Sequence, residues 1–315
     1  MTFNTMQLAH TDPAASWRAI WAQQAQAHPY TALGLALALA AVLLLLAASV
    51  WRVASGESEA ALRLALLGGG AGFAATALGA LLALFLRHLS TRTEDTMLGL
   101  AAGMMLAASS FSLILPGLAA GETLTGSAHA GALTVVAGLA LGVLLMLGLD
   151  RFTPHAHEHG GPCGAGCGRV SRVWLFVFAI ALHNLPEGMA IGVAFSKADI
   201  AVGLPLTTAI ALQDIPEGLA VAMALKAAGL TPMRAVGIAA LSGLMEPLGA
   251  LLGVGLASGL ALAYPIGLGL AAGAMIFVVS HEVIPETHRN GHQTPATIGL
   301  MAGFAVMMVL DTTLG

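Results

Sequence analysis

Residues 179–195 have the sequence AIALHNLPEGMAIGVAF, an apolar stretch interrupted by the polar residues of HNLPEG at positions 183–188. Residues 209–225, AIALQDIPEGLAVAMAL, align with this stretch without a gap. Both lie in segments long enough to cross a bilayer, where an ionisable group costs roughly 2.5–3.5 kcal/mol on insertion scales and is a functional candidate. The repeated stretch therefore predicts a membrane-spanning fold with a polar site inside it.

The two copies supply matched polar side chains, which are His183, Asn184, Glu187, Gln213, Asp214 and Glu217. Residues four apart share one face of a helix, so each copy presents its polar groups as a stripe. Imidazole nitrogen and oxygen ligands converging from two helices suit a divalent metal ion. The alternative is a pair of kinked helices packed through a structural polar network, but six polar groups at matched positions favour a site.

The composition places the chain among multi-span α-helical membrane proteins. Of 315 residues, 57% are apolar and 9% are charged, 39 are glycine, and the mean hydropathy is +0.87. A soluble domain of this length does not tolerate that balance. The formal net charge of −4 argues against a nucleic-acid partner.

Nine spans are predicted, one preliminary span and eight that form a core. They cover residues 31–50, 62–86, 96–119, 131–152, 173–196, 200–228, 232–258, 260–284 and 295–314. We expect the organisation to be a cytosolic leader at 1–30, an additional N-terminal transmembrane helix at 31–54 and an eight-span core at 62–315. A His- and Cys-containing cytosolic loop occupies 153–172 of that core. The two motifs lie in consecutive, antiparallel spans, which is typical of transporters built from inverted repeats.

The basic residues predict the orientation. Nine of the twelve lie in the leader and in the loops after the second, fourth, sixth and eighth spans, namely Arg18, Arg87, Arg92, Arg151, Arg169, Arg172, Lys226, Arg234 and Arg289. Only Arg52, Arg63 and Lys197 lie on the opposite side. Lys and Arg accumulate on the cytosolic side of membrane proteins. We therefore expect a multi-pass protein of the plasma (inner) membrane with a cytosolic N-terminus and an extracytoplasmic C-terminus.

The paired motifs resemble those of the ZIP family of divalent-metal (zinc/iron) transporters, of the bacterial type. The resemblance rests on HNLPEG, the second PEG motif in the next span, the His-bearing loop, the stretch HEVIPETH at 281–288 and the count of eight core spans. It implies an all-α integral membrane protein with an eight-helix core containing an inverted repeat, plus one additional N-terminal transmembrane helix. It also implies Zn²⁺ as the usual substrate, with Cd²⁺, Fe²⁺ or Mn²⁺ as others.

In that family the paired motifs form a binuclear metal site, so the resemblance assigns metal roles to all six matched polar residues. One departure is Gln213, which stands where many relatives have His. A Gln oxygen binds Zn²⁺ more weakly than imidazole, which leaves the metal preference open.

Further residues are candidates for the metal site or for the path by which ions would reach and leave it. Glu246, before Pro247, is expected to be a ligand or to support one, with a structural acid as the alternative. Met105 offers a thioether to soft ions, although methionine in an apolar helix is usually packing. His281, Glu282 and His292 lie near the cytosolic end of the seventh core span. We favour an exit path there over plain interfacial polarity.

The loop carries His155, His157, His159, Cys163 and Cys167, and its composition predicts weak, flexible metal binding. A solvated loop without a metal role is the alternative. Asp150 and Asp311, expected at opposite membrane faces, are candidates for lining the path.

These features favour a transporter that moves divalent transition-metal ions into the cytosol, not an enzyme. The absence of a GxxxxGK[ST] motif argues against direct drive by ATP. Its partners are expected to be metal ions and the lipid bilayer, with no nucleic acid, and a homodimer is left open. The alternative is an intramembrane metal-dependent hydrolase, against which the duplicated site argues because one hydrolytic centre needs no such symmetry.

Overall fold

A computed structural model describes residues 17–54, 59–86, 90–152, 155–157, 161–163, 172–257 and 260–314. The helices are α1 (Trp17–Ala27), α2 (Pro29–Ala54), α3 (Glu59–Leu82), α4 (Thr91–Ala108), α5 (Leu115–Thr125), α6 (Ala128–Phe152), α7 (Arg172–Ala194), α8 (Ile200–Ala227), α9 (Pro232–Ser242), α10 (Met245–Ala257), α11 (Ala263–Val278), α12 (Ile284–Thr287) and α13 (Gln293–Leu314). Two π-helical segments, η1 (Ser109–Ile114) and η3 (Val279–Val283), continue α4 into α5 and α11 into α12. Two short strands, β1 (His155–His157) and β2 (Gly161–Cys163), pair antiparallel.

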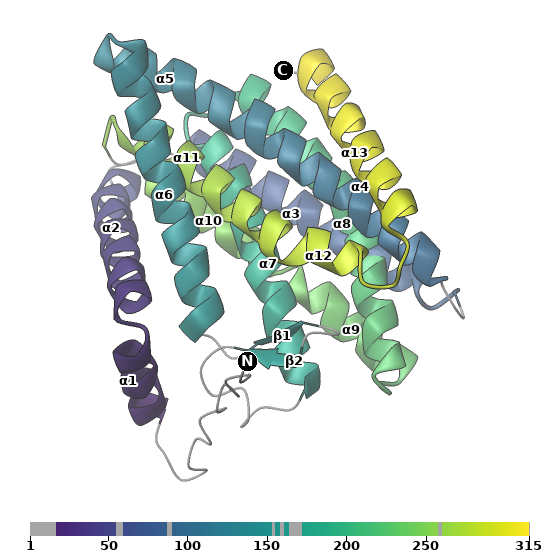
Figure 1. The fold of residues 1–315 in the computed structure, drawn as a ribbon. Helices are drawn as coiled ribbons and strands as arrows, with labels where there is room; N and C mark the ends of the chain where they lie inside the picture. The colour runs from purple at the N-terminus through teal and green to yellow at the C-terminus, as the bar shows by residue number, and fades with distance from the viewer. Residues whose placement is uncertain are drawn as a thin grey trace, which may run out of the picture.

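The helical membrane fold expected from the sequence is confirmed. Seven helical stretches in the described part of the chain are long and apolar enough to cross a membrane, when the consecutive segments α4–η1–α5, α9–α10 and α11–η3–α12 are each counted as one stretch. Helices α2 and α7, with 26 and 23 residues, also have spanning length, but part of each lies outside the described side chains. The helices run roughly along one another as a bundle, with α1 and α2 on the outer side of α6 (Figure 1).

Glycine lets four pairs of helices approach closely, α3 with α8, α7 with α10, α4 with α13 and α6 with α11. In the α7–α10 pair, a Cβ added at Gly192 would lie 2.1 Å from the carbonyl oxygen of Ala250. A Cβ added at Gly253, on the other helix, would lie 2.2 Å from the carbonyl oxygen of Met189. Backbones this close admit only hydrogen at these positions, as in the small-residue interfaces of membrane helices.

The four pairs form two groups. We call α3, α7, α8, α9 and α10 the site bundle, because both repeated motifs and Glu246 lie in it. We call α4, α6, α11 and α13, with the segments that extend them, the frame bundle. The pairing is consistent with the predicted inverted repeat: α3–α8 corresponds to α10–α7, and α4–α13 corresponds to α11–α6.

Proline explains the irregular points of these helices. The predicted span 232–258 is in fact two helices, α9 and α10, separated by Gly243 and Leu244. Pro247 cannot donate a backbone hydrogen bond to residue 243 and its ring crowds that carbonyl, so the helix breaks there. Pro116 and Pro285 likewise each lie two residues beyond a π-helical segment.

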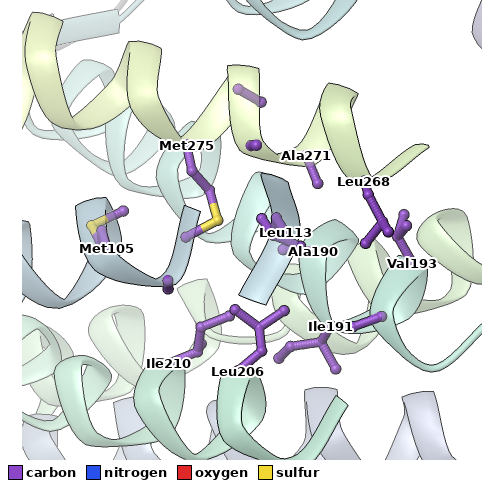
Figure 2. Close-up of a cluster of buried hydrophobic side chains, with 14 of the residues drawn as sticks. Met105, Leu113, Ala190, Ile191, Val193, Leu206, Ile210, Leu268, Ala271 and Met275 are labelled. Carbon is purple, nitrogen blue, oxygen red and sulfur yellow. The ribbon is translucent and has the colours of Figure 1, made fainter. Parts of the chain in front are cut away.

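Apolar side chains fill the contact between the two bundles. Figure 2 shows Met105, Leu113 and Met275 of the frame bundle facing Leu206 and Ile210 of the site bundle. All five are nearly fully buried. The contact between the bundles is therefore made by side chains, whereas each pair inside a bundle is held at the backbone.

The β1–β2 hairpin lies in the segment predicted to be a loop. The sequence offered no apolar side chains to order this segment, but the pairing of His155 with Cys163 requires only backbone groups. The hairpin and the end of α13 lie at opposite ends of the bundle (Figure 1).

Candidate metal centre

Three segments of the site bundle bring the candidate ligands together. Helix α7 carries Asn184 and Glu187, helix α8 carries Gln213, Asp214 and Glu217, and the first turn of α10 carries Glu246. The motif prolines lie inside α7 and α8, and Glu246, in the first turn of α10, is fully buried. The positive end of a helix dipole stabilises a carboxylate in the first turn.

Carboxylates form the centre of the site. Glu187, Asp214 and Glu217 each offer one oxygen, and these oxygens lie within 4.8 Å of one another. Glu187 and Asp214 are buried, while Glu217 is partly exposed. Oxygen ligands at this spacing can bind one or more divalent cations.

Four buried side-chain oxygens in this region have no hydrogen-bond partner among the described residues, namely Glu187 Oε2, Gln213 Oε1, Asp214 Oδ2 and Glu246 Oε2. In three of these side chains, Glu187, Gln213 and Glu246, the other polar atom is hydrogen-bonded. Gln213 Nε2 donates to Glu187 Oε1 at 2.5 Å, and Thr76 Oγ1 donates to Glu246 Oε1 at 2.8 Å. An unpaired buried acceptor is costly. Divalent cations bound in this region would supply partners for these oxygens.

His183 connects this centre to the frame bundle. Its Nε2 lies 2.6 Å from Oε2 of Glu282 in η3, and both side chains are largely buried. His183 is also near enough to Glu217 to interact with it electrostatically. The sequence assigned His183 to the midplane site and Glu282 to the exit path, and the structure places the two in direct contact.

The other two candidate ligands are buried. Asn184 is 3% exposed, one helical turn before Glu187. Met105 is 2% exposed and lies in the apolar contact between the bundles, where Met275 supplies a second sulfur (Figure 2). The sequence did not indicate Met275 as a candidate ligand, because a methionine in an apolar helix usually serves in packing.

The candidates for the path lie at two other places. His281 is half exposed, stacks on Phe277 with ring centroids 5.0 Å apart, and has Nε2 at 3.9 Å from Oδ2 of Asp150. His292 Nδ1 lies 2.8 Å from Oδ2 of Asp95, a buried residue that sequence reasoning missed. An acid just before an apolar run, with Ser90 capping the helix, was the only signal for it.

Asp95 also accepts a hydrogen bond from Asn290 at 3.0 Å. It therefore ties the start of α4 to the segment before α13. Asp311, the second acidic candidate, accepts a hydrogen bond of 2.6 Å from Ser112 in η1. In the His/Cys loop, His159 and Cys167 lie outside the described residues, so the structure leaves the predicted metal role of that loop untested.

Comparison with known proteins decides the family. Residues 163–311 match the family model described as ZIP Zinc transporter. The chain is 67% identical over 302 residues to zinc transporter ZIPB of Bordetella bronchiseptica, covering 96% of this chain and 98% of the relative. The chain belongs to the ZIP family.

Other members of the ZIP family are similar over most of the chain. Zinc transporter GufA of Myxococcus xanthus is 43% identical, covering 76% of this chain and 95% of its own. Zinc transporter ZupT of Corynebacterium glutamicum is 37% identical, covering 75% and 93%. This ZIP protein is thus a multi-pass membrane transporter and not an enzyme, so the hydrolase alternative is excluded.

Proposed function

We propose that this ZIP protein carries divalent transition-metal ions, zinc foremost, into the cytosol through a binuclear site near the bilayer midplane. The observation that carries the proposal is the group of four buried, unpartnered oxygens around Glu187, Asp214 and Glu217. Relatives named as zinc transporters support zinc as the substrate. Cd²⁺, Fe²⁺ and Mn²⁺ are further candidate substrates, because oxygen ligands discriminate weakly among them.

The ligands divide between two ions in this proposal. Glu187 and Glu217 occupy equivalent positions in the two motif copies and bridge both ions. His183 and Gln213 serve one ion, and Asn184 and Asp214 serve the other. Glu246 completes the oxygen set, and Met105 is a soft ligand reached when the bundles shift.

The proposed path leads from the extracytoplasmic side to the site and onward to the cytosol. The apolar contact of Figure 2 is a barrier to a hydrated ion, so the site bundle moves against the frame bundle to open it. On the cytosolic side, Glu282, His281 and His292 receive the ion before the His/Cys loop.

The positions of the basic residues support the rest of the proposed organisation in the membrane. We propose an inner-membrane protein with a cytosolic leader at 1–30, an additional transmembrane helix at 31–54 and the transporter core at 62–315. The sequence leaves a homodimer open, and we expect no nucleic-acid partner.

Uptake of radioactive zinc by proteoliposomes tests the function. Purified protein should accumulate Zn²⁺ over empty vesicles, and Glu217→Ala should reduce uptake to background. Glu122→Ala, which removes an exposed carboxylate of α5, is the matched control and should retain wild-type uptake. Wild-type flux equal to that of empty vesicles across a range of pH and membrane potential would refute the proposal.

A further inference from the structure

Helix α3 carries no residue of the repeated motifs, yet it forms one wall of the metal centre. Gly72 and Thr76 lie four residues apart and so share one face of this helix. Both are buried. The hydroxyl of Thr76 donates the 2.8 Å hydrogen bond to Oε1 of Glu246.

The space at Gly72 is filled by ligand oxygens. A Cβ added there would lie 1.6 Å from Oε2 of Glu246 and 3.2 Å from Oδ2 of Asp214. These two oxygens receive no hydrogen bond from a donor group among the described residues, and the two carboxyl groups lie within hydrogen-bonding reach of each other. The usual role of glycine in this bundle differs: a Cβ at Gly79, on the same helix, would meet the backbone carbonyl of Ile215. Gly72 thus makes room for carboxylates and not for a neighbouring helix backbone.

Thr76 decides which oxygen of Glu246 is left for a cation. Because Oε1 accepts the hydroxyl hydrogen, Oε2 is the oxygen that remains on the side of Gly72 and Asp214. The methyl-bearing side of Thr76 faces the break between α9 and α10, where a Cβ added at Gly243 would lie 3.0 Å from the Cβ of Thr76. One side chain therefore contacts both the ligand and the helix break that presents it.

We propose that Gly72 and Thr76 are positioning residues of the metal centre. Gly72 leaves the space into which Glu246 and Asp214 each direct one carboxylate oxygen, and Thr76 fixes the rotation of the Glu246 carboxylate. The inference rests on the proposed metal site and assigns α3 a role in it. The ligand affected is the divalent ion closest to Glu246 and Asp214.

Thr76→Val tests the hydroxyl without changing the size of the side chain. It should weaken Zn²⁺ binding to purified full-length protein by about tenfold, the effect of one hydrogen bond to a charged group. Thr76→Ser restores the hydroxyl and should return the affinity to within about threefold of wild type by the same measure. Equal affinities for wild type and Thr76→Val would overturn the role of Thr76. So would a loss of affinity that Thr76→Ser fails to rescue, because that result indicates packing alone.

Gly72→Ala tests the space, with Gly70→Ala as its control. An added Cβ at Gly70 meets nothing within 4 Å. Gly72→Ala should lower the zinc bound per protein and change the absorption spectrum of bound Co²⁺, which reports coordination geometry, while Gly70→Ala should match wild type. Size-exclusion profiles and thermal midpoints identify a variant that fails to fold, and Thr76→Val then decides the proposal. Wild-type protein that binds no zinc would refute the metal site itself, whereas a Gly72→Ala variant that binds like wild type would refute only this inference.

Discussion

The negative charge of the carboxylates determines how much cationic charge the candidate metal centre can bind. At an effective dielectric constant near 20, two carboxylates about 5 Å apart repel each other by roughly 3 kcal/mol. Glu187, Asp214, Glu217 and Glu246 together carry four formal negative charges, which two divalent ions balance. Bound divalent ions would therefore allow all four acids to remain ionised in one buried place, where they would otherwise protonate in part.

The number of metal ions bound per protein tests the proposed assignment of ligands to two ions. Glu187→Gln or Glu217→Gln should lower the metal bound per protein by more than one equivalent, because in the proposed site each carboxylate bridges both ions. Asp214→Asn should leave one tightly bound ion. Elemental analysis of purified protein measures this, with Glu122→Gln as the control. The two-ion arrangement is wrong if Asp214→Asn loses both ions or if wild type never holds more than one.

The contact between His183 and Glu282 leads to a second residue-scale prediction. His183 Nε2 cannot bond to a metal ion and to Glu282 Oε2 at once, so an ion that binds this nitrogen competes with the carboxylate for it. Glu282→Gln should leave equilibrium metal stoichiometry unchanged and slow transport severalfold. The comparison needs binding and flux measured on one preparation. A parallel fall in both would show instead that Glu282 belongs to the midplane site.

The sequence predicted the carboxylate centre because its two halves are a local repeat. Glu187 and Glu217 occupy matched positions in two antiparallel helices, so one alignment locates both. The alignment did not identify Thr76 or Asp95, because each of them contacts a residue from a segment far away in the chain. A single threonine in an apolar helix is more often bonded to its own backbone.

Among the elements, backbone contact through glycine distinguishes the pairs within a bundle from the contact between bundles. Gly192→Ala should lower the thermal midpoint by several degrees, because overpacking a close interface typically costs about 1–3 kcal/mol. Gly237→Ala on α9, where an added Cβ meets nothing within 4 Å, should leave the midpoint unchanged or slightly raised. Differential scanning in detergent compares the two. Equal midpoints would contradict the assignment of the α7–α10 contact to backbone packing.

The elements also repeat beyond the two motifs. Gly142 precedes Asp150 on α6 by eight residues, and Gly303 precedes Asp311 on α13 by eight. Each aspartate lies near a π-helical segment of its neighbour, Asp150 by His281 and Asp311 by Ser112. The sequence indicated the inverted repeat in two helices only. Outside the motifs the two halves share only single glycines and acids, and hydrophobic periodicity does not reveal such a similarity.

For the whole molecule, orientation decides which end of the proposed path opens to the cytosol. In a variant otherwise free of cysteine, a cysteine in the loop 155–167 should resist an impermeant maleimide in intact cells, and one at Gly315 should react. The nine-to-three split of basic residues is the reason. Permeabilised cells, in which both sites should be labelled, are the control. The reverse pattern would overturn both the span count and the direction of the path.

The glycine contacts have a consequence for genetics. Where an added methyl group meets a backbone carbonyl, as at Gly192, no change of side chain on the facing helix can make room for it. Where it meets a side chain, as at Gly34 against Leu144, a smaller neighbour can. In a search for second-site suppressors, a defect caused by Gly34→Ala should be repaired at position 144. A defect caused by Gly192→Ala should be repaired only by restoring glycine, so the paired glycines are positions that compensatory mutation cannot reach.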